Sequence, residues 1–153
     1  MDAKAKILVV DNDEVVRLSY LRSLAGAHCN VEAVWDGTEA LRAMEQQPFD
    51  VILLDLRMPG MDGISVLKTI KEKWPESEVV IITGYPTIET AKEAVGLGAY
   101  DYLAKPVGPD DVIKAANGAM TRKKWALHRD RTETDEGTSS STGSRWKTSS
   151  HAY

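Results

Sequence analysis

The sequence predicts an α/β fold in which a doubly wound parallel sheet is covered by helices on both faces. Five short apolar runs recur along the chain, and stretches with apolar residues at helical spacing separate them. The first, third and fourth runs are unbroken Val, Ile and Leu, which is typical of strands buried on both faces. Because each parallel crossover requires a helix, the strict alternation indicates a parallel sheet.

The strands are expected where the apolar runs lie. Ile-Leu-Val-Val opens the series, and Val-Ile-Leu-Leu and Val-Val-Ile-Ile follow as the third and fourth runs. The second and fifth runs are less uniform, since each includes an acidic residue. The five predicted strands are Ile7–Val10, Val31–Trp35, Val51–Leu54, Val79–Ile82 and Tyr100–Leu103.

Apolar residues at helical spacing predict a helix after each strand. Asp36 followed by Glu39 is close to a capping box and indicates where the second helix begins. Pro48 and Pro75 end the helices that precede the third and fourth strands. Gly118 is expected to weaken the last helix by about 1 kcal/mol. The five predicted helices are Val15–Leu24, Thr38–Met44, Ile64–Trp74, Ile88–Val95 and Val112–Met120.

The 153 residues suit one domain followed by a polar tail. Residues 1–122 form the expected domain, and residues 123–153 are expected to extend the last helix and then to form a Ser/Thr-rich disordered tail. From Thr132 onward, 11 of 22 residues are Ser or Thr and the apolar periodicity is gone. Such a segment cannot bury enough apolar surface to offset the entropy cost of ordering it.

Charge and cysteine content exclude several functions. The chain carries 12 basic and 19 acidic residues up to Met120, against 7 basic and 4 acidic after it. A duplex would repel this acidic body, so no direct nucleic-acid binding is expected. A single Cys29 agrees with a reducing cytoplasm. No apolar run approaches the ~18 residues of a membrane span, so we expect a cytoplasmic protein without membrane contact.

Polar residues follow four of the five predicted strands. Asp11 and Asn12 follow the first strand, Asp55 the third, Thr83 the fourth and Lys105 the fifth. In an open parallel sheet these positions share one rim, where ligands bind. A carboxylate there can accept a phosphoryl group, hard oxygen ligands suit Mg²⁺, and Lys and Thr side chains can hold the phosphoryl oxygens. The pattern therefore predicts phosphoryl transfer to a carboxylate.

Four stretches make the interpretation more specific. They read I-L-V-V-D-N-D, D-V-I-L-L-D-L-R-M-P-G-M-D-G, V-V-I-I-T-G-Y and Y-D-Y-L-A-K-P. Over about residues 5 to 122 the chain resembles the receiver domain of two-component response regulators, the CheY-like family. The resemblance implies a (βα)5 fold with strand order 2-1-3-4-5. It also implies phosphorylation of Asp55 by a histidine kinase or a histidine phosphotransfer protein, with Mg²⁺ as cofactor.

The resemblance assigns the metal ligands by matching position. They are expected to be Asp11, Asn12, Asp55 and the backbone carbonyl of Arg57. The family usually has an acid where this chain has Asn12. One negative charge is therefore missing, and we expect weaker Mg²⁺ binding than in an Asn12→Asp variant.

The remaining matching residues concern the phosphoryl group and the switch. Lys105 is expected to bind phosphate, and the Lys105–Pro106 peptide is expected in the cis form. Thr83 is the expected switch hydroxyl and Tyr102 the switch aromatic. Together they would reshape a face drawn from residues 88–95, 100–105 and 112–120, which would control a partner.

The motifs T-G-Y-P-T-I-E-T-A-K-E-A and G-A-Y-D-Y-L-A-K-P are closest in style to receivers of the nitrogen-regulation type, in which an ATPase and a DNA-binding domain follow. Only about 30 residues follow here, so we expect either a stand-alone receiver with a separate output protein or a fragment whose output domain is missing. A receiver dimer is possible. No enzymatic activity is expected beyond self-phosphorylation and autodephosphorylation.

Two alternatives remain open. The amide at Asn12 favours a second interpretation, a pseudo-receiver that binds partners without phosphorylation. Asp11 begins a D-x-D-x-V pattern that fits a haloacid-dehalogenase-like phosphatase, with Asp11 as nucleophile. The phosphatase alternative leaves Asp55 and the loop that follows it unexplained.

Overall fold

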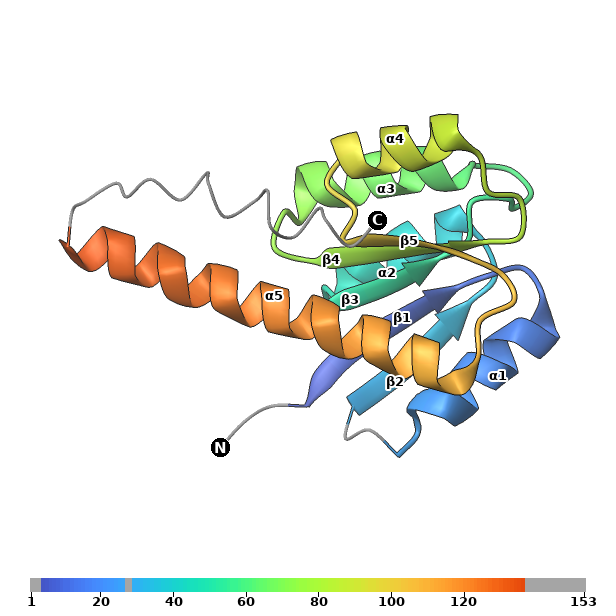
Figure 1. Cartoon of the computed structure of the whole chain (residues 1–153), viewed down its shortest axis with the longest axis horizontal. Coiled ribbons are helices and arrows are strands. Elements are labelled where there is room, and N and C mark those ends of the chain that lie inside the picture. Colours follow the sequence, from blue (N-terminus) through green and yellow to red (C-terminus); the bar gives the residue numbers. More distant parts are fainter. Residues whose placement is uncertain (1–3, 27–28, 137–153) are drawn as a thin grey trace. The chain divides into compact units, whose positions relative to one another are not determined.

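The computed structural model describes residues 4–26 and 29–136 of the chain. Strands and helices alternate without exception along these residues (Figure 1). Each predicted strand and helix is present, with ends that differ from the expected ones by a few residues except at the last helix. The elements are β1 (Ala5–Val10), α1 (Glu14–Leu24), β2 (Cys29–Val34), α2 (Gly37–Gln46), β3 (Val51–Leu54), α3 (Gly63–Lys73), β4 (Glu78–Thr83), α4 (Ile88–Gly96), β5 (Asp101–Ala104) and α5 (Pro109–Glu136).

The five strands form one parallel sheet in the order β2-β1-β3-β4-β5, which confirms the expected topology. Val9 pairs with Leu53 across β1 and β3, and Leu53 pairs with Val80 across β3 and β4. The three central strands are the three unbroken apolar runs, whereas the mixed runs, β2 and β5, form the edges. Edge strands are more exposed, so they tolerate the acidic residues that interrupt their sequences.

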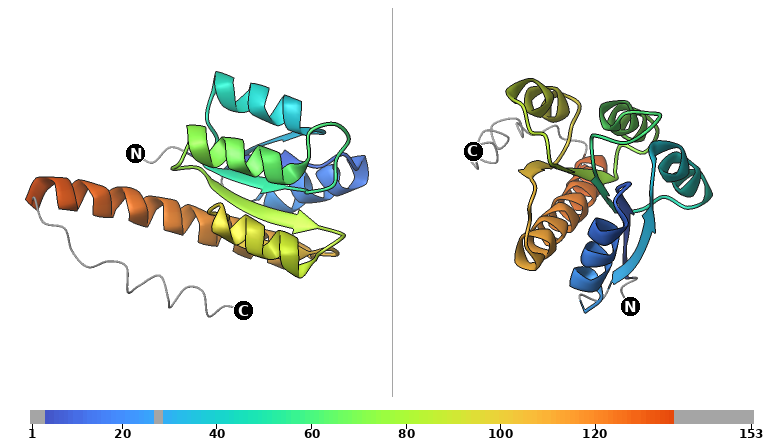
Figure 2. Two further views of the ribbon diagram at one scale, coloured as in Figure 1. Left: turned by 90° about the horizontal axis from the view of Figure 1, so that it is seen from above. Right: turned by 90° about the vertical axis from the view of Figure 1, so that its right-hand side faces the viewer.

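Alternate residues of the central strands point to opposite faces of the sheet and build two cores. Figure 2 (right) shows α1 and the first part of α5 on one face and α2, α3 and α4 on the other. The core under α2, α3 and α4 includes Leu8, Ile52, Ile81, Met44, Leu67 and Ala94. The core under α1 and α5 includes Ile7, Leu53, Val80, Leu24, Val112 and Ala119.

The last helix is longer than expected. It runs from Pro109 to Glu136, which covers the helix extension expected from residue 123 and also residues 132–136, where disorder was expected. No Gly or Pro occurs between Gly118 and Gly137, and Arg, Lys and Glu, which have good helix propensity, are frequent there. The rest of the predicted tail, residues 137–153, lies outside the described residues. Within residues 4–26 and 29–136, no helix has the length and apolar character needed to cross a membrane.

Candidate functional site

The polar residues that follow the strands gather at one rim of the sheet, as the sequence predicts. The amide of Asp55 donates to the carbonyl of Val10 (3.0 Å), so the pairing of β1 and β3 extends one residue beyond β3. In the same way the amide of Lys105 donates to the carbonyl of Thr83 (2.8 Å). These bonds fix where each side chain leaves the sheet. Strand order reverses between β1 and β3, where ligands bind in folds of this kind.

Lys105 bridges two buried carboxylates at this rim. Its Nζ atom lies 2.8 Å from Oδ2 of Asp11 and 3.4 Å from Oδ2 of Asp55. Asp11 is 2% exposed and Asp55 is 6% exposed, so their charges are largely removed from water. Two buried carboxylates and one ammonium leave a net negative charge, which can attract a further cation.

The surroundings shift the pKa values of this group. Burial raises the pKa of Asp55, and the charge of Asp11 raises it further, although Lys105 and the Arg57 amide oppose the change. Burial acts to lower the pKa of Lys105, but the hydrogen bond and charge of Asp11, together with Asp55, outweigh it and leave that pKa raised. Tyr20, buried in α1, has its pKa raised by burial and then by the charges of Asp11 and Asp55.

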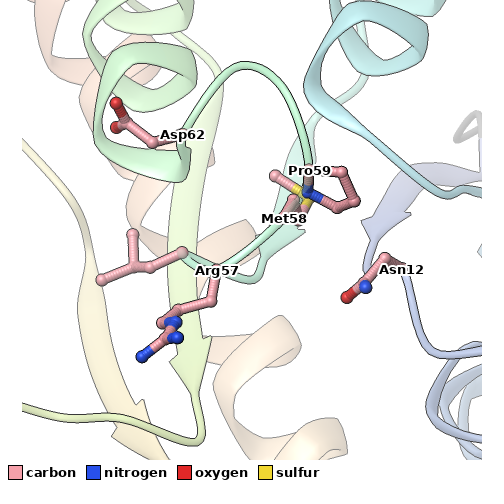
Figure 3. Close-up of a pocket in the computed structure, with 6 residues that line it drawn as sticks. Asn12, Arg57, Met58, Pro59 and Asp62 are labelled. Carbon is pink, nitrogen blue, oxygen red and sulfur yellow. The ribbon is translucent and has the colours of Figure 1, made fainter.

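The polar residues Asp11, Asn12 and Asp13, which follow β1, make different contacts. Oδ1 of Asp11 accepts from the amide of Asp13 (2.9 Å). Asp13 is the N-cap of α1, because its Oδ1 accepts from the amides of Val15 and Val16. This oxygen of Asp13 is therefore occupied by the helix. Asn12, by contrast, is exposed, and Figure 3 shows its amide pointing into the cavity lined by Arg57 and Pro59.

The donor set fits Mg²⁺ in its chemistry. Carboxylate, amide and carbonyl oxygens are the hard ligands that this ion prefers, and Mg²⁺ keeps several waters and so needs few protein ligands. Asp11, Asn12 and Asp55 stand at one cleft, as expected. No cluster of three or more His, Cys, Asp or Glu side chains placed to hold a metal occurs in the described part of the chain. Arg57 lines the same cleft, and its amide lies 3.3 Å from Oδ1 of Asp55.

A guanidinium and an aromatic ring that both line the cleft are in contact with each other. The guanidinium carbon of Arg57 lies 4.0 Å from the ring centroid of Tyr85, within the range of a cation–π contact. The cleft has a volume of about 390 Å³ and is lined by Asp11, Asn12, Asp13, Asp55, Arg57, Gly84, Tyr85 and Lys105.

The two expected switch residues make hydrogen bonds to residues other than the carboxylates. Thr83 is fully buried, and its hydroxyl accepts from the amide of Tyr85 (3.1 Å). The hydroxyl of Tyr102 accepts from the amide of Thr87 (3.2 Å), which is the N-cap of α4, and lies 2.6 Å from the hydroxyl of Thr90. Both switch residues therefore bond to the segment that joins β4 to the first turn of α4. The Lys105–Pro106 peptide is cis, as expected.

Two residues of the site are not among the residues that the sequence predicted. Arg17 donates from Nη1 to the backbone carbonyl of Asp11 (2.7 Å), a contact between residues that five positions separate in the sequence. Gly63 opens α3 so close to β3 that a Cβ atom there would lie 2.6 Å from the carbonyl oxygen of Asp55. The D-G pair of the loop motif is the one signal that marks Gly63, because a glycine after an N-cap Asp permits such an approach.

Comparisons with known proteins agree with this geometry. Residues 7–117 match the family described as response regulator receiver domain. The chain is 38% identical over 115 residues to the DNA-binding transcriptional regulator NtrC of Escherichia coli (strain K12), covering 75% of this chain and 24% of that protein. It is 35% identical over 109 residues to a putative NtrX-like response regulator of Rickettsia felis, covering 70% of this chain and 23% of that protein. The chain thus spans about a quarter of the length of these relatives.

Solved structures show the same relationship. A response regulator receiver domain protein from Clostridium thermocellum is 34% identical with a TM-score of 0.75, covering 80% of this chain and 98% of that one. NtrX from Brucella abortus is 33% identical with a TM-score of 0.77, covering 86% of this chain and 30% of that one. The matching region includes Asp11, Asp55, Thr83 and Lys105. The chain belongs to the response regulator receiver domain family of two-component systems, with NtrC-like and NtrX-like relatives.

Proposed function

We propose that Asp55 accepts a phosphoryl group from a histidine kinase or a histidine phosphotransfer protein. The observation that carries the proposal is the bridging of Asp11 and Asp55 by Lys105 at the carboxyl rim of the sheet. A buried carboxylate beside a fixed ammonium provides both a nucleophile and a positive charge for the phosphoryl oxygens.

The transfer follows from this arrangement. A carboxylate oxygen of Asp55 attacks phosphorus, and the new P–O bond forms as the P–N bond to the donor imidazole breaks. The bonding pair remains on the imidazole nitrogen. Asp11, Asn12, Asp55 and the Arg57 carbonyl would hold Mg²⁺, which supplies positive charge next to the phosphoryl oxygens. Water later cleaves the same P–O bond and releases inorganic phosphate. The chemistry of the chain is therefore limited to its own phosphorylation and dephosphorylation.

The switch couples this chemistry to a surface. The Thr83 hydroxyl turns from the Tyr85 amide towards the phosphoryl group, and Tyr102 follows. Because Tyr102 bonds to Thr87 and Thr90, its movement releases the first turn of α4. The surface formed by α4, β5 and the first part of α5 then presents a changed face to a partner, to a second receiver or to an output domain.

The output is proposed from the relatives. NtrC is named a DNA-binding transcriptional regulator, which supports control of transcription through another domain or protein in the cytoplasm. The receiver itself contributes no nucleic-acid contact in this scheme, since its body is acidic.

The proposal is tested by incubating the full chain with acetyl phosphate and Mg²⁺ and measuring phosphoprotein by intact mass. We expect the mass of one phosphoryl group on the wild type and on an Asp13→Asn control, and none on Asp55→Asn. Asp11→Asn should be labelled more weakly. Labelling that persists in Asp55→Asn but disappears in Asp11→Asn would indicate the phosphatase alternative, and absence of labelling in every form would indicate a pseudo-receiver.

A further inference from the structure

Asp11 is held through all four of its polar atoms. Its amide donates to the carbonyl of Val34 (3.1 Å). Its Oδ1 accepts from the amide of Asp13 (2.9 Å), and its Oδ2 accepts from Lys105 (2.8 Å). Its backbone carbonyl accepts from Nη1 of Arg17 (2.7 Å). The partners come from β2, the turn after β1, the segment after β5, and α1.

The bond from Arg17 is the shortest of the four and the one made by a side chain to the main chain. Arg17 lies in α1, is half-buried, and reaches back over the first turn of its own helix. A guanidinium donor makes a charge-assisted hydrogen bond, which is stronger than a bond between neutral groups. Because it holds the carbonyl of Asp11, it fixes the peptide that joins Asp11 to Asn12.

We propose that Arg17 is a positioning residue for the cation site, an inference that rests on the proposed function. Arg17 would touch neither Mg²⁺ nor the phosphoryl group. It orients the peptide from which the Asp11 carboxylate and the Asn12 amide both project. Mg²⁺ demands near-ideal octahedral geometry, so loosening this peptide should weaken binding. Groups that orient metal ligands in this way typically change metal affinity 10- to 100-fold when they are removed.

Positioning and plain electrostatics predict opposite results. Arg17 carries a positive charge next to the backbone carbonyl of Asp11, and removal of a nearby positive charge by itself favours binding of a cation. If Arg17 acted only through its charge, an Arg17→Gln variant would bind Mg²⁺ more tightly than the wild type. If it positions Asp11 and Asn12, the same variant binds Mg²⁺ less tightly.

The experiment titrates the full chain with Mg²⁺ alone and follows the backbone amide resonances of Asp13 and Arg57. Arg17→Gln is compared with Arg22→Gln, which removes an equal charge from an exposed position of the same helix. We expect Arg17→Gln to weaken Mg²⁺ binding about tenfold or more and Arg22→Gln to change it by less than about twofold. The amide of Asp13, which donates to Asp11, should also shift in Arg17→Gln before any metal is added.

Affinity in Arg17→Gln that equals or exceeds the wild-type value overturns the inference and leaves the proposed function intact. Absence of saturable Mg²⁺ binding by the wild type instead contradicts the proposed function, and the role of Arg17 falls with it. If the amide spectrum shows that Arg17→Gln is unfolded, the titration uses Arg17→Lys, which keeps the charge but lacks the guanidinium. A loss of threefold or more then supports positioning, and a smaller loss overturns it.

Discussion

The Nζ atom of Lys105 lies 2.8 Å from Oδ2 of Asp11, although 94 positions separate the two residues in the sequence. β1 and β5 are not neighbours in the sheet, so the contact spans the rim above β3 and β4. Asp55, at the end of β3, is the second carboxylate that this ammonium reaches. Lys105 thus places one positive charge beside both buried carboxylates.

Replacing Lys105 by Met should lower the stability of the protein without Mg²⁺ but raise its affinity for Mg²⁺. Without the ammonium, the two buried carboxylates repel each other, and the free energy of unfolding in the absence of Mg²⁺ should fall by about 3 kcal/mol. The same unpaired carboxylates should bind Mg²⁺ several-fold more tightly. Urea unfolding with and without Mg²⁺ measures both effects. An unchanged stability without Mg²⁺ would show that Lys105 does not neutralise the pair.

The Asn12→Asp variant should bind Mg²⁺ about tenfold more tightly, because it adds a negative charge within the cleft. Asp13 cannot fully supply this charge in the wild type, since its Oδ1 caps α1. Titration of Mg²⁺ against Trp fluorescence or amide shifts gives the two dissociation constants. Asp62→Asn, a change in the loop after β3, is a control for altered net charge. Equal affinities in wild type and Asn12→Asp would refute the prediction.

Glu78 is a buried acid at the opposite end of the sheet, where β4 begins. It is 5% exposed, its Oε2 lies 3.3 Å from Nε of Arg122, and its Oε1 accepts no hydrogen bond from the described residues. Lys71 lies 3.9 Å from Oε1 but donates instead to the carbonyls of Pro75 and Ser77. Burial raises the pKa of Glu78, and Arg122 and Lys71 only partly oppose it.

This raised pKa predicts how stability depends on pH. The folded state favours the neutral carboxyl group, so its contribution is fully present below the unfolded pKa and is lost as pH rises through the folded pKa. The wild type should therefore gain stability relative to Glu78→Gln as pH falls through the raised pKa. Urea unfolding over this range measures the difference, with the exposed Glu76→Gln as control. Loss of wild-type stability relative to Glu78→Gln as pH falls would contradict the assignment.

Gly118 shows why a glycine can stand inside a helix. A Cβ atom there would lie 2.3 Å from the hydroxyl and 3.1 Å from Cζ of Tyr100, the residue before β5. Gly118→Ala should therefore lower the free energy of unfolding by about 1–2 kcal/mol, despite the better helix propensity of Ala. Gly96, at the end of α4, has open space around its Cα, and Gly96→Ala should raise stability by about 0.5 kcal/mol. Thermal unfolding of the two variants compares them directly. Equal gains in both would contradict the close packing of Tyr100.

The three central strands could be predicted because burial on both faces leaves unbroken apolar runs. Most helices could be predicted because burial of one face leaves apolar residues at helical spacing. The end of α5 could not, since apolar periodicity stops near Met120 while the charged residues after it still favour a helix. Periodicity reports burial rather than helicity, so it underestimates a helix whose later residues have no apolar repeat. The contact of Gly118 with Tyr100 is likewise tertiary, and the sequence shows only a residue of poor helix propensity.

Within the site, Asp11, Asp55 and Lys105 could be predicted because parallel strands bring their carboxyl ends to one rim. The bond from Arg17 to Asp11 and the fit of Gly63 against Asp55 could not, because they depend on how a helix turns relative to the sheet. The assignment of Tyr102 required the family resemblance. Its bonds to Thr87 and Thr90 follow from the packing of α4 against β5 and leave no local pattern.

Chemical trapping of the acyl phosphate tests the central claim most directly. After incubation with a phosphorylated histidine phosphotransfer protein and Mg²⁺, borohydride reduction converts an aspartyl phosphate to homoserine, and peptide mass spectrometry locates the change. We predict homoserine at position 55 alone. Homoserine at position 11, or an unmodified Asp55 in a chain that has taken up phosphate, would contradict the account.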